Sequence, residues 1–275
     1  MRHVSTSIFS HPNISEVEKQ PGKRSAAITT TEPCLRLATQ RLASQYLLPL
    51  IKISEQESFE FILILNEQGL SLQHTREKDS SNLQINFLKG EIAYRLRHIQ
   101  DQKQLLVKAL GRKIHPNATV LDLTAGLGND GFILAQLGFS VTLLERSSII
   151  AALLSDGLQR ALHHEKYSHI NIQLIHIDAT LFLKKILQTK QFPEIIYLDP
   201  MYPHSNKSAL VKKEMRLLRE IVGNDDDAET LLPLALTCAQ RVVVKRPRLA
   251  SFLAKLKPHH SIVGKQHRFD IYLNR

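Results

Sequence analysis

The sequence predicts an α/β fold built on a mostly parallel sheet, wound on both faces and closed by an antiparallel hairpin. Three observations predict it. From residue 119 onward, apolar strand-sized runs alternate with helical patterns, which is typical of a doubly wound sheet. The first of these strands leads into a glycine-rich turn that opens a helix. The last two strands are joined by a short link, and such a close pair must form a hairpin.

Hydrophobic periodicity places each element of this sheet. The predicted strands span residues 120–123, 140–145, 170–178, 194–199 and 241–245, and the closing hairpin spans 261–265 and 269–273. The predicted helices span 130–137, 148–162, 180–188, 207–221, 227–239 and about 249–256. Every parallel connection therefore carries a helix, as right-handed crossovers require.

The glycine-rich turn reads D-L-T-A-G-L-G-N-D-G over residues 122–131. Gly126 and Gly128 permit positive φ and let a ligand approach the backbone, while the following helix begins with free N–H groups. The turn also satisfies G-x-G-x-x-G, a weak pattern that nominally suggests NAD or FAD. A tight turn with Asp130 as a helix cap is the purely structural alternative.

Two acids and the closing hairpin favour S-adenosylmethionine (SAM) as the cofactor instead. Asp122 ends the first strand, where its carboxylate suits a ligand with an ammonium and a sulfonium group. Asp130 lies at the helix entrance, where a pyrophosphate would otherwise sit. A parallel sheet with a terminal antiparallel hairpin is the layout of SAM-dependent methyltransferases rather than NAD enzymes. The predicted fold class is therefore a Rossmann-like methyltransferase sheet.

Acids also end the second, third and fourth strands, at the edge where α/β sheets bind ligands. Glu145 follows Gly126 by about twenty residues, the spacing of a ribose-binding acid. Asp178 is placed to reach the adenine amine, and capping the next helix is an equally open role. Asp199 begins the loop Asp-Pro-Met-Tyr-Pro. These acids predict a cofactor site along the carboxyl edge of the sheet.

The loop from Asp199 to Pro203 suits chemistry on an exocyclic base amine. Such a nitrogen is a poor nucleophile because its lone pair is delocalised into the ring. Asp199 and the Pro200 carbonyl are candidate acceptors for the amine N–H groups, and Tyr202 is a candidate stacking platform for an extruded base. Two prolines stiffen the loop. Positioning is then expected to carry most of the rate.

The overall charge suggests a polyanionic partner. The chain has 275 residues, a net charge of +10 and a pI of about 9.6, which favour RNA or DNA over a membrane. Basic residues follow the catalytic loop, end the fifth strand and fill the hairpin turn. The predicted phosphate contacts are Lys207, Lys212, Arg216, Lys245, Arg246 and Arg268.

The first third of the chain reads as a tail and a small domain. Residues 1–30 are polar and aperiodic, so a flexible tail is expected. Residues 31–111 are expected to form a small α+β domain with an antiparallel meander, and 112–275 the methyltransferase domain. The two cysteines lack metal or disulfide spacing, and no apolar run reaches a membrane span. We therefore expect a cytoplasmic protein without a metal site.

The motifs together resemble the ribosomal RNA small subunit methyltransferase J family. They are D-x-T-A-G-L-G-x-D, L-E-R, L-D-P-M-Y-P-H, K-S-A-L-V-K-K-E-M-R, R-V-V-V-K-R-P and H-R-F-D-I-Y. The resemblance runs from about residue 33 to the end. It implies SAM-dependent methylation of N2 of one guanine in 16S rRNA, near the 3′ end. The SAM contacts that it implies are Asn129, Asp130, Glu145, Arg146, Asp178, Ala179 and Asp199.

Two other readings of the residues remain open. A D-P-x-Y-like loop also serves adenine N6, so a SAM-dependent adenine methyltransferase acting on DNA or RNA is one alternative. A non-catalytic RNA-binding assembly factor that kept the fold is the other, although an intact acid loop beside an intact cofactor cradle argues against it. Detection of methyl transfer separates the two classes.

Overall fold

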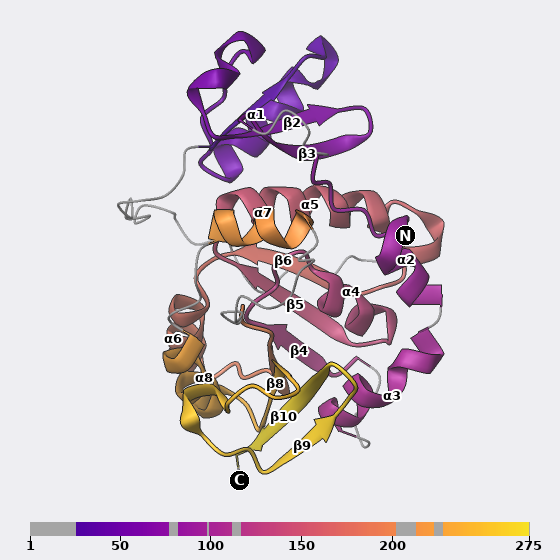
Figure 1. Cartoon of the computed structure of the whole chain (residues 1–275), viewed down its shortest axis with the longest axis vertical. Helices are drawn as coiled ribbons and strands as arrows, with labels where there is room; N and C mark the ends of the chain where they lie inside the picture. Colours follow the sequence, from indigo (N-terminus) through magenta and orange to yellow (C-terminus); the bar gives the residue numbers. More distant parts are fainter. Residues whose placement is uncertain are drawn as a thin grey trace.

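The computed structural model describes residues 26–76, 82–97, 99–111, 117–201, 213–222 and 228–274. Two sheets organise these residues: a three-stranded sheet near the N-terminus and a seven-stranded sheet that forms the body of the molecule (Figure 1). The small sheet packs on helix α5 (Ser148–Leu162) of the larger unit. The predicted cofactor-binding and catalytic residues belong to the large sheet and its loops.

The large sheet has the predicted topology. Its strands are β4 (Thr119–Asp122), β5 (Ser140–Glu145), β6 (Ile172–His176), β7 (Ile195–Leu198), β8 (Arg241–Pro247), β9 (His260–Val263) and β10 (His267–Leu273). They lie in the order β6-β5-β4-β7-β8-β10-β9, and only the pairings of β10 with β8 and β9 are antiparallel. The order reverses between β4 and β7, which places a crevice at their carboxyl ends.

Helices cover both faces of this sheet. They are α4 (Asn129–Gln136), α5 (Ser148–Leu162), α6 (Ala179–Thr189), α7 (Lys213–Val222) and α8 (Ala228–Cys238), with a 3-10 turn at Glu165–Tyr167. Ser147 caps α5 and Asp178 caps α6, each accepting backbone N–H bonds. Figure 1 shows α6 and α8 together on one side of the sheet.

Two hydrophobic cores lie on opposite faces of the sheet. Along β4, Val120 belongs to the core that contains α4 and α5, whereas Leu121 belongs to the core that contains α6 and α8. Tyr197 and Val243 point to the first face, and their strand neighbours point to the second. This alternation follows from the period of two along a strand. The same alternation decides which charged side chains of the strands can reach the crevice at the carboxyl ends of β4 and β7.

The small unit differs from the predicted meander. Its strands are β1 (Ala26–Thr30), β2 (Phe61–Asn66) and β3 (Gly69–His74), with helix α1 (Arg36–Gln45) and 3-10 turns at Pro33–Leu35 and Ile53–Ser58. β1 pairs parallel with β2 across α1, so this part is a βαβ unit. Leu83 makes only an isolated bridge to Leu72. The prediction of a loose tail to residue 30 is therefore wrong for residues 26–30.

Two helices link the small unit to the large sheet. α2 (Gly90–Arg97) contacts α4, and α3 (Ile99–Leu110) packs against β8, β9 and β10. The Arg241 side chain donates a hydrogen bond to the Ala109 carbonyl at 3.1 Å. Both helices therefore pack on the large unit, although they lie within the predicted small domain of residues 31–111. One core runs through both units, from Leu63 through Phe87 to Phe132.

Most elements of the large sheet fall within a few residues of their predicted positions. The helix predicted at about 249–256 is wrong: only a 3-10 turn, Leu253–Lys255, forms there. Ala254 and Lys255 have φ of 51° and 56°, which an α-helix cannot contain. Among the described residues, none of the helices is sufficiently long and apolar to span a membrane.

Candidate cofactor and active site

A cavity of about 300 Å³ lies at the carboxyl ends of β4, β5, β7 and β8, over the point where the strand order reverses. Its size and its place in the sheet are those of a small-molecule site. The predicted residues that line it are Asp122, Gly126, Asn129, Asp130, Glu145, Arg146, Asp178, Ala179, Asp199 and Pro200. The structure therefore brings nearly the whole predicted cofactor set together.

The two glycines of the turn have different tasks. Gly126 has φ of 52°, and a Cβ built there would meet nothing nearer than the Thr124 carbonyl at 4.0 Å. Gly128 has φ of 76°, but its Cβ would lie 2.5 Å from Leu154 Cδ1 and 3.3 Å from the Phe87 ring. Gly128 does not line the cavity. The side of Gly128 that a Cβ would occupy faces the core, and its predicted contact with the cofactor stays a prediction.

Glu145 and Asp178 hold the walls of the cavity. The buried Glu145 carboxylate accepts the Gly126 N–H at 3.0 Å and the Ser147 N–H at 2.7 Å, so it ties the glycine turn to the end of β5. Asp178 Oδ1 accepts the Thr180 and Leu181 N–H groups as the cap of α6. Both acids also line the cavity, so the capping role of Asp178 does not exclude its predicted contact with the cofactor.

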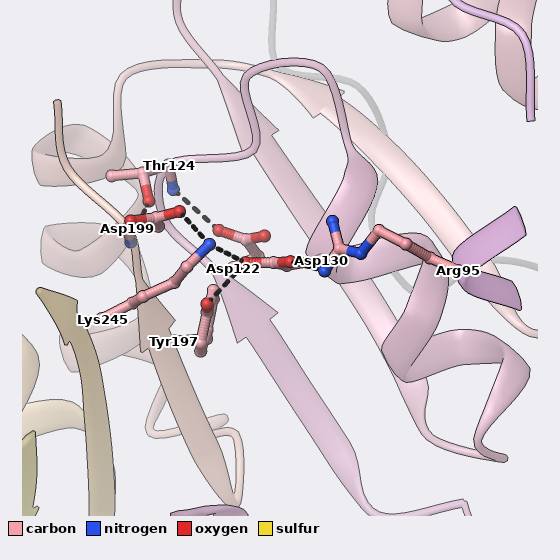
Figure 2. A network of polar contacts seen from close by, with 7 residues as sticks. All are labelled: Arg95, Asp122, Thr124, Asp130, Tyr197, Asp199 and Lys245. Carbon is pink, nitrogen blue, oxygen red and sulfur yellow. Dashed lines mark hydrogen bonds and ion pairs between the residues drawn. The ribbon is translucent and has the colours of Figure 1, made fainter. Parts of the chain in front are cut away.

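Asp130 is the centre of a polar network (Figure 2). Its Oδ2 accepts the Tyr197 hydroxyl at 2.8 Å and the Lys245 ammonium at 2.6 Å, and its Oδ1 accepts Arg95 Nη2 at 3.2 Å. Burial disfavours the charged form, yet Lys245 and Arg95 hold the pKa of the Asp130 carboxyl well below its usual range. Asp130 is therefore an anion inside the cavity.

Lys245 joins this network to the catalytic loop. Its Nζ lies 2.6 Å from Asp130 Oδ2 and 2.8 Å from Asp199 Oδ2, and its side chain is 23% exposed. Although burial opposes its charge, the two carboxylates raise the pKa of the Lys245 ammonium. Its charge is thus directed into the cavity and shared between two acids, and a contact of Lys245 with RNA phosphates stays a prediction.

Asp199 is positioned through both its backbone and its side chain. Its N–H donates to the Thr124 hydroxyl at 2.7 Å, which connects the loop after β7 to the loop after β4. Desolvation in the cavity raises the pKa of Asp199, against the opposing effect of Lys245, and the Asp130 carboxylate adds to the rise. Lys245 is therefore the main group that favours the anionic form of Asp199, with a smaller contribution from His267.

Asp122 lies beneath the glycine turn and is almost completely buried. Its Oδ1 accepts the Thr124 N–H at 3.0 Å. Burial raises the pKa of Asp122 to about 8, although the Thr124 hydrogen bond and Lys245 act against the rise. A cationic ligand in the cavity would favour its ionised form, so this acid is poised to respond to the cofactor.

The loop after Asp199 is described in part. Pro200 is buried and, with Met201, lines the cavity. Tyr202, Lys207 and Lys212 lie outside the described residues, so their predicted roles stay predictions. Arg216 lies in α7, a helix whose Leu218 and Val222 line the cavity, but its side chain is also outside the described part.

Arg246 and Arg268 are not surface cations. They are 6% and 7% exposed and face the side of the sheet opposite Lys245. Arg268 makes bonds of 2.8 Å and 3.0 Å to Asp270 and donates to backbone carbonyls, while Arg246 donates to the Ser251 carbonyl at 3.0 Å. The prediction that they bind phosphates is wrong, because adjacent strand residues alternate faces and the loop that follows β8 covers this one.

Four contributors to the site were missed or misassigned from the sequence. Arg95 belongs to the predicted small domain of residues 31–111, yet it reaches Asp130 from α2. Tyr197 and Thr124 were read only as parts of a strand and a turn. The strand-end rule that found the acids could have found Lys245, which also ends a parallel strand. The contact of Arg95 depends on tertiary packing and left no local signal.

The residues present fit SAM. The cavity carries five carboxyl groups, from Asp122, Asp130, Glu145, Asp178 and Asp199, against the cations Arg95, Arg146 and Lys245. This excess of acids suits a ligand with ammonium and sulfonium charges and disfavours a dinucleotide pyrophosphate. The open space over Gly126 lets the ligand approach the backbone there. The fold and the site therefore define a SAM-dependent methyltransferase.

Comparison with known proteins agrees with this class. The profile of the SAM-dependent methyltransferase family SAM_MT matches residues 46–274. A crystal structure of a SAM-dependent methyltransferase from Neisseria gonorrhoeae superposes with a TM-score of 0.70 at 34% identity, covering 90% of this chain and 96% of that one.

Curated relatives place the chain within a narrower family. The ribosomal RNA small subunit methyltransferase J of Coxiella burnetii is 47% identical over 90% of this chain and 96% of its own length. The protein of the same name from Thioalkalivibrio sulfidiphilus is 45% identical over 87% of this chain and 94% of its own. The chain belongs to the ribosomal RNA small subunit methyltransferase J family.

Proposed function

We propose that the protein transfers a methyl group from SAM to the exocyclic N2 of a guanine in 16S rRNA of the small ribosomal subunit. The observation that carries this proposal is the network in which Lys245 bridges Asp130, on the cofactor side, and Asp199, at the start of the catalytic loop. The family membership supports the rRNA substrate. The guanine N2 position follows from the resemblance of the motifs.

The acids that line the cavity would hold the cofactor. Glu145 would accept the ribose hydroxyls, and Asp178 would accept the adenine amine. Asp122 and Asp130 supply negative charge near the glycine turn, where the cationic amino acid part of SAM would lie. When bound, SAM supplies an electrophilic methyl group on a positively charged sulfur. Residues of this chain must orient the guanine amine and keep Asp199 in position and ionised.

The first of these tasks is to orient the guanine amine. The Asp199 carboxylate and the Pro200 carbonyl would accept its two N–H groups, so that the nitrogen faces the methyl donor. Tyr202 would stack on the extruded base. The amine nitrogen would lose one proton when it accepts the methyl group, and the Asp199 carboxylate would receive that proton. Positioning of a good leaving group supplies much of the rate.

The second task is to keep Asp199 in position and ionised. Thr124 fixes its backbone N–H, and Lys245 fixes its carboxylate from the opposite side. A protonated Asp199 would lose an acceptor and could not take up the proton. Because Lys245 also binds Asp130, the cofactor half of the site and the catalytic loop share one cation (Figure 2). This connection is hard to reconcile with a non-catalytic assembly factor.

An rRNA substrate would place the enzyme in the cytoplasm, and the charge of +10 suits a polyanionic partner. The test is methyl transfer in vitro with SAM that carries a labelled methyl group. The substrates are small ribosomal subunits, their extracted 16S rRNA, large-subunit rRNA and duplex DNA. We expect label in the small-subunit RNA, released by digestion as N2-methylguanosine.

Asp199→Asn is the matched control, since it preserves size but removes the anionic acceptor. Label recovered as N6-methyladenosine would contradict the guanine assignment. Label that enters no RNA, from a protein that binds SAM, would contradict the substrate class.

A further inference from the structure

The segment 247–257, here called the rim loop, leaves β8 at the catalytic edge of the sheet. Lys245 lines the cavity two residues before the loop starts. Pro247 pairs with His267 across the β8–β10 ladder, and the charges of Asp130, Asp199 and Lys245 act on His267. Within the loop, the turn Leu253–Lys255 packs against α8, whose first residues also line the cavity (Figure 1). The start of the rim loop therefore borders the active site, and its later residues run back along the sheet to β9, whose first residue, His260, pairs with Ile271.

Buried side chains hold this loop from beneath. Arg268 Nη1 donates to the carbonyls of Pro247, Arg248 and Ala250, at 3.4, 2.8 and 2.8 Å. Arg246 donates to the Ser251 carbonyl, and the Tyr272 hydroxyl donates to the Leu256 carbonyl at 2.9 Å. Five of the eleven carbonyls of the loop thus point inward, so its outer side chains are presented from a fixed backbone.

The backbone of the loop also carries strain. Ala254 and Lys255 both have positive φ, at 51° and 56°, although neither is glycine. Two successive residues in this region are costly for side chains with a Cβ. A strained backbone that buried groups hold in place is common where a loop has a recognition task.

The outer surface of the loop combines apolar and positively charged groups. Leu249 is 93% exposed, and Phe252 and Leu256 are each 38% exposed. The exposed cations of the loop are Arg248, Lys255 and Lys257. No acid occurs between Glu229 and Asp270. Cations beside a projecting apolar side chain suit a nucleic acid, whose phosphates pair with the cations while a base step receives the apolar group.

We propose that the rim loop is an RNA-contact surface on which Leu249 packs against the base adjacent to the target guanine, while Arg248, Lys255 and Lys257 contact phosphates. This inference rests on the proposed function. It assigns the RNA contacts to residues other than Lys245, Arg246 and Arg268. The buried Arg246 and Arg268 then stabilise the backbone of the loop through their hydrogen bonds to its carbonyls. Leu249 would fill the space that the extruded guanine leaves in the stack.

The test compares Leu249→Ala with Phe192→Ala, a matched truncation of an exposed apolar residue. Phe192 is 48% exposed and precedes β7, at the edge of the sheet opposite the cavity. The substrate is unmodified 16S rRNA, with SAM affinity and thermal stability measured in parallel. We expect Leu249→Ala to lower kcat/KM for RNA about tenfold without changing SAM affinity or Tm, and Phe192→Ala to match the wild type.

Two further measurements separate the roles within the loop. An RNA fragment with 2-aminopurine beside the target should gain fluorescence on binding to the wild type, and less with Leu249→Ala, if Leu249 replaces the base in the stack. The double variant Lys255→Glu, Lys257→Glu should flatten the dependence of log K on log salt.

Wild-type kinetics for Leu249→Ala would overturn the proposal. So would a defect that appears only on assembled subunits and not on RNA, which would indicate a ribosomal protein as the partner of the loop. If the wild-type enzyme itself methylates no rRNA, the proposed function fails first, so the two failures can be distinguished.

Discussion

The two halves of the catalytic edge differ in how their charges are arranged. On the β4–β5 side, Glu145 binds backbone N–H groups and lines the cofactor cavity, as a strand-end acid should. On the β8–β10 side, the cations divide between the two faces: Lys245 turns into the cavity, and Arg246 and Arg268 turn to the opposite side. The first half follows from strand position alone. The β8–β10 side shows that basic residues adjacent in the sequence of a strand point to opposite faces of the sheet.

The largest expected effect is at the junction of the two halves. Asp199→Asn should fold normally and lose turnover by about 10²–10⁴-fold, because the amine loses an anionic acceptor and a base. The measurement is single-turnover methyl transfer at saturating SAM, with thermal unfolding as the control. Some loss of SAM affinity is compatible with this role, since Asp199 lines the cavity. Turnover near the wild-type level would refute the mechanism.

Lys245→Met tests whether the β8 side serves the catalytic step. We expect turnover to fall by about 10–100-fold with a smaller change in RNA affinity, whereas a phosphate contact would give the reverse. The groups whose charges act on Asp199 include Lys245, Asp130 and His267. Without the ammonium, the pKa of Asp199 rises, so the loss of activity on acidification should begin at higher pH than in the wild type.

Lys245→Arg is the conservative partner of this variant. It should restore the acidic limb of the pH–rate profile toward the wild type while regaining only part of the turnover, because a planar guanidinium differs in shape from an ammonium. An unshifted acidic limb in Lys245→Met would mean that the lysine does not act through Asp199.

Gly126 and Gly128 allow a separate test of cofactor binding and stability on the β4–β5 side. Gly128→Ala should lower the free energy of unfolding by about 2–4 kcal/mol, since its Cβ would meet Leu154 in a left-handed backbone. Gly126→Ala should cost only about 1–2 kcal/mol but should weaken SAM binding, because its Cβ would project into the cavity. Chemical denaturation and calorimetry measure the two effects. Equal stability losses with equal affinity losses would contradict the division of roles.

The smallest expected effect concerns Asp122. Its pKa of about 8 means that much of this acid is protonated at pH 7. A cationic cofactor stabilises the ionised form and lowers that pKa, so binding should release protons. SAM affinity should therefore rise as the pH increases from about 6 and should level off above 8. Calorimetry in buffers of different ionisation enthalpy measures the released protons, and Asp122→Asn should abolish the release.

The parts of this site that the sequence predicted are those fixed by local pattern. Strand ends located Asp122, Glu145, Asp178 and Asp199, because the alternation of strands and helices brings these ends together. The same rule and the strand period of two could have separated Lys245 from Arg246. The contact from Arg95 to Asp130 spans 35 residues and depends on how α2 packs, which no periodicity encodes. The parallel pairing of β1 was missed because the segment before residue 30 looks polar and aperiodic.

The most direct test is nucleoside mass spectrometry of 16S rRNA from cells that lack the gene. Such cells are complemented either with the wild-type protein or with Asp199→Asn. The account predicts one N2-methylguanosine that is lost on deletion, restored by the wild type and not restored by Asp199→Asn at equal expression. A 16S rRNA whose N2-methylguanosine content is unchanged by deletion, or is restored fully by Asp199→Asn, would contradict it.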